Sequence, residues 1–168
     1  MEIKDSGMRR EFDTGAVRDI QEGKGRCDLL PLDVIARLEM GAGTEDVMHF
    51  ISEYQRTGDF SYLIEALQTG CYTLSYKESA IHHTHMVNML LEVSKHFEEG
   101  AKKYGEYNWQ KGIPTHCYID SAVRHYLKWL RGDDDEPHNR AFIWNLLCCI
   151  WTCIHKPELN DYAKENKE

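Results

Sequence analysis

Residues 91–151 decide the fold, and they read LEVSKHFEEGAKKYGEYNWQKGIPTHCYIDSAVRHYLKWLRGDDDEPHNRAFIWNLLCCIW. Apolar residues recur in this stretch at the i, i+3, i+4 spacing of amphipathic helices. The spacing predicts three successive helices: one from about Ala80 to Tyr104, one from just after Pro114 to Arg131, and one that starts in the acidic 133–137 segment and ends at Lys156. Acids, bases, His and Asn lie at the borders of the apolar stripes, which indicates a lined pocket rather than a plain bundle.

The third helix is apolar on nearly all sides, so we expect it to be the buried central helix. Around this segment, residues 1–26 carry no sustained apolar period and predict an extended arm. Asp28 is a candidate cap for a helix that runs through Leu38. Residues 41–79 read as an inserted hairpin of two helices, and residues 156–168 as a polar tail. The two expected helices run from Glu45 to Tyr54 and from Phe60 to Leu67, and Thr69-Gly70 ends the second.

No run of alternating β-branched residues and no Asn-Gly turn competes with the helical pattern. The prediction is therefore a single all-α domain of 168 residues, a helical bundle with an inserted helical hairpin and an N-terminal arm.

Composition narrows the function classes. A net charge of −8 argues against binding of a nucleic acid polymer, because that binding depends on Lys and Arg at phosphates. The longest apolar run, Phe142 to Ile154, is shorter than the roughly 20 residues of a membrane span. The N-terminus lacks the apolar core of a secretory signal, so we expect a cytoplasmic protein without membrane contact. The six cysteines show no CxxC pair, which favours free, buried thiols.

Two acids recur at equivalent helix borders. On a helical wheel Glu98 falls at the edge of its apolar stripe, half-buried at a groove, and Glu99 points away toward solvent. Lys102 follows Glu98 by four residues, and Arg124 follows Asp120 by four. Each pair is open to two interpretations: a surface ion pair, or part of a site in which Mg²⁺ or Mn²⁺ separates the facing carboxylates.

Histidines and basic residues give weaker signals. His125 lies about 140° from Asp120 on the wheel, so we do not expect the two to share an ion. His138 and Asn145 share one stripe of the last helix. These polar side chains either find their hydrogen-bond partners on neighbouring helices or line the pocket. The His82–His85 cluster lacks the spacing of a helical zinc pair, so it carries no assignment.

At this point the sequence resembles a known family. Several ordered blocks carry the resemblance: Phe12 to Asp19, Gly23 to Pro31, Glu98 to Gly112, Asp120 to His125, and Asp135 to Asn145. They resemble the dATP/dGTP diphosphohydrolases of phages and prophages, over roughly residues 9–40 and 90–155. That family is similar in turn to the all-α, MazG-like nucleotide pyrophosphohydrolases, which use Mg²⁺ and cleave between the α- and β-phosphates.

The resemblance implies a reaction in which a purine deoxynucleoside triphosphate and water give the monophosphate and pyrophosphate. The implied metal ligands are Glu98, Asp120 and Glu136, with Mg²⁺ or Mn²⁺ as the cofactor, and the catalytic set is Glu98, Asp120 and His138. The implied substrate-binding residues are Lys24, Arg26, Lys102, Lys103, Tyr104, Asn108, Trp109, Arg124, His125 and Asn145.

One departure from the family pattern keeps a second function open. MazG-like enzymes carry ExxE on one helix and ExxD on the next, whereas Ala101 and Val123 stand at the second positions here. The alternative is a phage protein that sequesters a nucleotide without cutting it. A third interpretation is a purely structural helical protein whose polar borders are interface pairs. MazG-like proteins form dimers or tetramers, so the expected partners are a purine nucleotide and further copies of the chain.

Overall fold

A computed structural model describes residues 7–20, 44–75 and 82–163. Five α-helices dominate this part of the chain, so the all-α prediction is confirmed. Their bounds are α2 Thr44–Thr57, α3 Ser61–Ser75, α4 His82–Tyr104, α5 Thr115–Arg131 and α6 His138–His155. Two short 3-10 helices follow α4 and α6, namely η2 Asn108–Lys111 and η3 Pro157–Leu159. The helix predicted over residues 28–38 lies outside the described residues.

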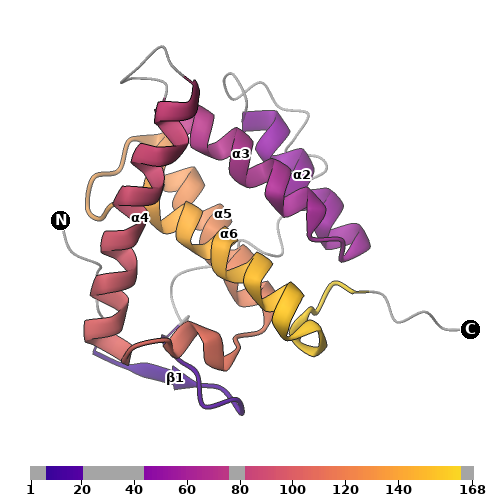
Figure 1. Cartoon of the computed structure of the whole chain (residues 1–168), viewed down its shortest axis with the longest axis vertical. Helices are drawn as coiled ribbons and strands as arrows, with labels where there is room; N and C mark the ends of the chain where they lie inside the picture. Colours follow the sequence, from indigo (N-terminus) through magenta and orange to yellow (C-terminus); the bar gives the residue numbers. More distant parts are fainter. Residues whose placement is uncertain (1–6, 21–43, 76–81, 164–168) are drawn as a thin grey trace, which may run out of the picture.

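Helix α6 is the central element, as its composition predicts. It packs against α5, α3 and α4, and Figure 1 shows α5 and α6 in the middle of the molecule, with α4 on one side and the α2–α3 pair on the other. Most of its apolar residues are therefore covered within one chain, although Ile154 is 52 % exposed.

The ends of α5 follow local chemistry. Pro114 precedes the first residue of α5, where its missing N–H costs no helical bond. At the other end Gly132 adopts a left-handed conformation with φ of 89°, and its N–H donates to the carbonyls of Lys128 and Trp129. Pro137 likewise stands immediately before α6. Helix α5 begins and ends where the sequence predicts, and α6 ends as predicted but begins at His138, so that the acidic 133–137 segment precedes the helix rather than forming its first turn.

Helix α3 runs further than predicted, because Gly70 does not stop it. The helix continues to Ser75, and Gly70 lies under the ring of Phe142 on α6. A Cβ at position 70 would come within 2.5 Å of Phe142 Cε1. This glycine is needed for close helix packing rather than for a turn.

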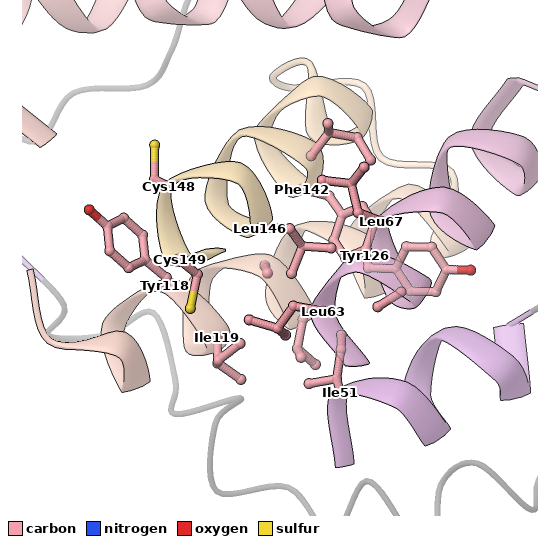
Figure 2. Packing of buried hydrophobic residues seen from close by; sticks show 14 of the residues in the cluster. Ile51, Leu63, Leu67, Tyr118, Ile119, Tyr126, Phe142, Leu146, Cys148 and Cys149 are labelled. Carbon is pink, nitrogen blue, oxygen red and sulfur yellow. The ribbon is translucent and has the colours of Figure 1, made fainter. Parts of the chain in front are cut away.

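The hydrophobic core joins the two predicted halves of the chain. Fully buried side chains of α2 and α3, among them Ile51 and Leu63, meet Ile119, Phe142 and Leu146 of α5 and α6 (Figure 2). Burial of each such side chain is worth about 1.5–3 kcal/mol. The predicted hairpin at residues 41–79 thus contributes to the core, and its origin as an insertion stays a prediction.

The N-terminal segment contains the one exception to the helical pattern in the described residues. Strands β1 (Arg9–Glu11) and β2 (Val17–Asp19) form an antiparallel hairpin with Arg10 opposite Arg18. The sequence carries no β signal here, because two three-residue strands are too short to show an alternating pattern. Figure 1 shows the hairpin beside the C-terminal end of α4.

The described cysteines Cys71, Cys117, Cys148, Cys149 and Cys153 are all free and buried, as predicted. Among the described helices, none is long and apolar enough to cross a membrane.

Candidate functional site

A cavity of about 1150 Å³ lies between the hairpin, the C-terminal half of α4, η2, α5 and α6. This volume exceeds what most drug-sized ligands need and is sufficient for a nucleotide. Predicted site residues from four elements line it: Glu98 and Tyr104 from α4, Asn108 and Trp109 from η2, Asp120, Arg124 and His125 from α5, Glu136 before α6, and Asn145 on α6.

Asn108 and Asn145 are among the residues that attach the hairpin to the bundle, and they close one side of the cavity. The side-chain amide of Asn108 donates to the Val17 carbonyl at 2.8 Å, and its Oδ1 accepts from the Val17 N–H at 3.0 Å. Arg18 Nη2 donates to Asn145 Oδ1 at 2.7 Å. The predicted substrate-binding residues Asn108 and Asn145 therefore position the hairpin at the cavity wall.

One wall of the cavity is aromatic. The ring of Phe97 lies 5.5 Å from that of Trp109 and 5.9 Å from that of Trp144, between centroids. The guanidinium of Arg18 lies 5.2 Å from the ring centroid of Tyr118. Flat rings and a guanidinium plane are surfaces on which a purine base can stack.

The two predicted catalytic acids differ sharply in burial. Asp120 is only 2 % exposed, and Arg124 Nη1 donates to its Oδ2 at 2.7 Å. Glu98 lies at the cavity rim with a side chain that is 64 % exposed, and Lys102 Nζ donates to its Oε1 at 2.5 Å. This hydrogen bond is the main cause of the lowered pKa of Glu98. The expectation that Glu98 is half-buried is wrong, because it faces the open side of α4.

Glu99 faces α6, although the sequence predicted that it points into solvent. Its two carboxylate oxygens accept from Nη2 of Arg140 at 2.6 and 2.8 Å, and the Arg140 side chain is 6 % exposed. Glu99 thus joins α4 to α6 rather than pointing into solvent. The wheel of one helix could not predict this contact, because the partner belongs to another helix.

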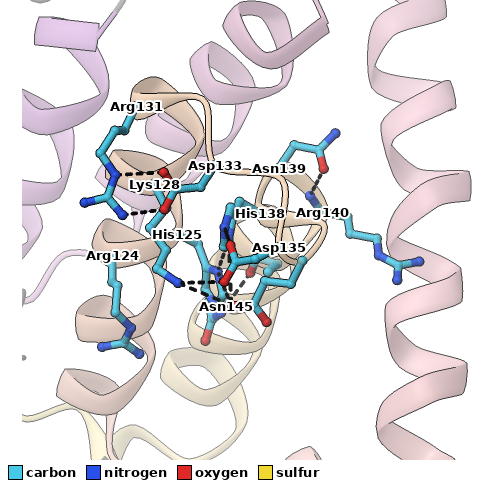
Figure 3. Close-up of polar contacts among 12 residues, drawn as sticks. Arg124, His125, Lys128, Arg131, Asp133, Asp135, His138, Asn139, Arg140 and Asn145 are labelled. Carbon is cyan, nitrogen blue, oxygen red and sulfur yellow. Dashed lines mark hydrogen bonds and ion pairs between the residues drawn. The ribbon is translucent and has the colours of Figure 1, made fainter. Parts of the chain in front are cut away.

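Histidines and acids meet where α5 approaches the start of α6 (Figure 3). His125 Nδ1 lies 3.0 Å from His138 Nδ1, and His138 Nε2 lies 2.7 Å from Asp135 Oδ1. Glu136 Oε1 is 3.7 Å from Nδ1 of both histidines. Burial, followed by the charge of Arg124, holds the pKa of His125 well below its usual value, so this imidazole is neutral at pH 7.

The stripe shared by His138 and Asn145 proves to have two roles. His138 is buried against His125 and Asp135, whereas Asn145 lines the cavity and donates to the Ala141 carbonyl at 2.8 Å. His125 and Asp120 line the same cavity although the wheel separates them.

The remaining predicted substrate-binding residues are dispersed. Lys102 and Lys103 lie at the C-terminal end of α4 but outside the cavity lining, and Lys103 Nζ lies 5.6 Å from the ring centroid of Tyr104. Lys24, Arg26 and the side chains of His82–His85 lie outside the described residues.

Residue-by-residue prediction missed several cavity residues, among them three with a basic or imidazole side chain. Arg18 stands in the resembling block Phe12 to Asp19 without an assigned role, Lys128 carried no signal, and His96 lies inside the α4 pattern. The His96 ring lies 5.3 Å from that of Trp144, and burial, then Arg140 and Arg18, lowers its pKa to about 3. A polar residue within an apolar stripe was the one available signal for His96.

Comparison with known proteins supplies the family. Residues 75–162 match the family described as dATP/dGTP diphosphohydrolase, N-terminal, and this match includes α4, α5, α6 and the cavity residues that they carry. Neither a curated protein nor a solved structure matches the chain. Because the match covers more than half of the 168 residues, the chain belongs to the dATP/dGTP diphosphohydrolase family.

Proposed function

We propose that this protein hydrolyses purine deoxynucleoside triphosphates to the monophosphate and pyrophosphate, with a divalent cation. The observation that carries the proposal is the cavity itself, which joins an aromatic wall to a wall of charged residues in a chain of this family. The base would stack near Phe97, Trp109 and Trp144, and the triphosphate would extend toward Arg124 and Lys128.

The donor type suits a hard cation, but the three acids would have to move to share one. Glu98, Asp120 and Glu136 supply carboxylates to one cavity from α4, α5 and the loop before α6, and their oxygens do not all lie within 4.8 Å of one another. Oxygen ligands of this kind suit Mg²⁺ or Mn²⁺. When bound, such an ion polarises phosphate oxygens and lowers the pKa of a coordinated water.

Ion pairs prepare the charged wall for a substrate of high negative charge. Arg124 now neutralises Asp120, and Lys102 neutralises Glu98. Arg124 lines the cavity and would offset the charge on the departing pyrophosphate if Asp120 were engaged by a cation, whereas Lys102 lies outside the cavity lining. We propose a cytoplasmic location, because the cytoplasm holds the nucleotide pool. We also propose a homo-oligomer, which light scattering would test.

The decisive experiment is chromatography of dGTP and dATP after incubation with the protein and MgCl₂. We expect the monophosphate and pyrophosphate in equal amounts, with no product in EDTA and a strong loss of turnover in Asp120→Asn. Glu53→Gln is the matched control, because Glu53 is also paired with a nearby base, Arg56, but lies on α2 away from the cavity. Unchanged triphosphate at high protein concentration would contradict the proposal.

One observation favours a second candidate function, the sequestration of a nucleotide. Asp120 and Glu98 are each already paired with a base one turn along their own helix, and Ala101 and Val123 stand where MazG-like enzymes have further acids. Calorimetry that shows tight binding, with the ligand recovered intact, would select this function over hydrolysis.

A further inference from the structure

The cluster at the α5–α6 junction has the geometry of a metal centre of its own. Nδ1 of His125, Nδ1 of His138 and Oε1 of Glu136 form a triangle with sides of 3.0, 3.7 and 3.7 Å. The point equidistant from the corners of such a triangle lies about 2.0 Å from each atom. Zinc–nitrogen and zinc–oxygen bonds have this length, about 2.0–2.2 Å.

We propose that His125, His138 and Glu136 bind a transition-metal ion of borderline softness, such as Zn²⁺ or Co²⁺. Two imidazole nitrogens and one carboxylate oxygen favour these ions over Mg²⁺, which prefers oxygen ligands. The site is distinct from the carboxylate-held cation of the proposed function but would share Glu136 with it, and it does not depend on hydrolysis.

The orientation of His138 supports the assignment. Its Nε2 lies 2.7 Å from Asp135 Oδ1, so a proton on Nε2 is held by that carboxylate and the lone pair remains on Nδ1. A carboxylate that orients a ligating histidine in this way is the usual second partner in metal sites. Figure 3 shows Asp135, His138 and His125 converging, with the Lys128 ammonium directed toward the same group.

The three ligands are held in place without an ion. The side chains of His125 and Glu136 are each 13 % exposed and that of His138 is fully buried. His125 belongs to α5 and His138 is the first residue of α6, and these two helices pack along each other. Lys128 Nζ lies 3.5 Å from Asp135 Oδ2 and 3.9 Å from Glu136 Oε1, so a cation already balances the acids.

A substrate can reach this centre from one side. His125 and Glu136 line the cavity, whereas His138 lies behind them. Three protein ligands with an open position toward a cavity are the arrangement of catalytic rather than structural zinc sites. The overlapping group Asp133, Asp135 and His138 is less suitable, because both oxygens of Asp133 accept from Arg131.

The test is titration of EDTA-treated, tag-free protein with Co²⁺, followed by visible absorption and without nucleotide. We expect d–d bands that saturate at one ion per chain, that Zn²⁺ abolishes and that excess Mg²⁺ leaves unchanged. Co²⁺ should bind at least 10–100-fold more weakly to Glu136→Gln and His125→Gln, and about 10–100-fold more weakly to Asp135→Asn. Circular dichroism and melting temperature verify that each variant is folded.

His116→Gln is the matched control. His116 also contacts a carboxylate, that of Asp161, but lies outside the cavity lining, so Co²⁺ affinity should stay at the wild-type value. Equal affinity in wild type and folded Glu136→Gln would overturn the proposal, as would the intense charge-transfer bands of thiolate ligation. Because no nucleotide is present, these outcomes are independent of whether the protein hydrolyses dNTPs.

Discussion

At the scale of single residues, burial separates two ion pairs that look alike in the sequence. Asp120–Arg124 is largely removed from water, whereas Glu98–Lys102 is exposed. Asp120→Asn should lower the free energy of unfolding by about 1–3 kcal/mol, because Arg124 loses a charged partner. Glu98→Gln should change it little, because water screens exposed pairs. Urea unfolding of both variants checks this; equal destabilisation would contradict the assigned burial.

His116 gives a pH-dependent contribution to stability. The hydrogen bond that His116 Nδ1 donates to the Asp161 carboxylate, and then the contact with Cys117, raise the pKa of His116 to about 10. Because the pKa of His116 is raised in the folded state, its protonation stabilises the fold in full below the unfolded pKa of about 6.5. This stabilisation is lost as the pH rises through about 10. Unfolding in urea at pH 6, 8 and 10 should therefore show a falling free energy that Asp161→Asn flattens. An unchanged slope in that variant would contradict the pairing.

At the scale of elements, two helical glycines should respond oppositely to Ala. Gly70→Ala places a Cβ 2.5 Å from Phe142 where α3 meets α6, and overpacking of this kind costs about 1–3 kcal/mol. Gly100→Ala on α4 meets nothing within 4 Å and should stabilise by about 0.5–1 kcal/mol, since Ala favours helix. Thermal unfolding measures both. Stabilisation by Gly70→Ala would show that α3 and α6 pack less closely.

The hairpin depends on Asn108, which bonds both backbone groups of Val17. Asn108→Ala removes both bonds, and we expect faster hydrogen exchange at Val17–Asp19 and weaker nucleotide binding because the cavity loses a wall. Asn88→Ala, at an exposed position of α4, is the control and should leave both unchanged. Unchanged exchange in Asn108→Ala would mean that other contacts hold the hairpin.

At the scale of the whole molecule, features set by neighbouring residues could be predicted from the sequence, whereas contacts between distant elements could not. Pro114 and Gly132 act within one turn of chain, so the limits of α5 were predictable, whereas α6 begins only after Pro137. The pair Glu99–Arg140 depends on how two helices rotate toward each other, and no single-helix pattern contains that information. The cavity likewise needs β2, α4 and α5 together, which is why its acids could be named and Arg18 could not.

The whole molecule should be stabilised by the ligand that its cavity accepts. At a concentration 100 times its Kd, dGTP would add about 2.7 kcal/mol, which corresponds to a rise of about 5–10 °C in melting temperature for a chain of this size. The rise in melting temperature should be larger with a purine nucleotide than with dTTP, because the aromatic wall of Phe97, Trp109 and Trp144 offers more stacking to the larger base. Fluorimetric melting with dGTP, dATP, dTTP and a DNA oligonucleotide, each with Mg²⁺ and with EDTA, makes the comparison.

The oligonucleotide should have no effect, since a net charge of −8 repels a polyanion. A shift with the oligonucleotide that matches the shift with dGTP would contradict the nucleotide assignment and the charge argument together.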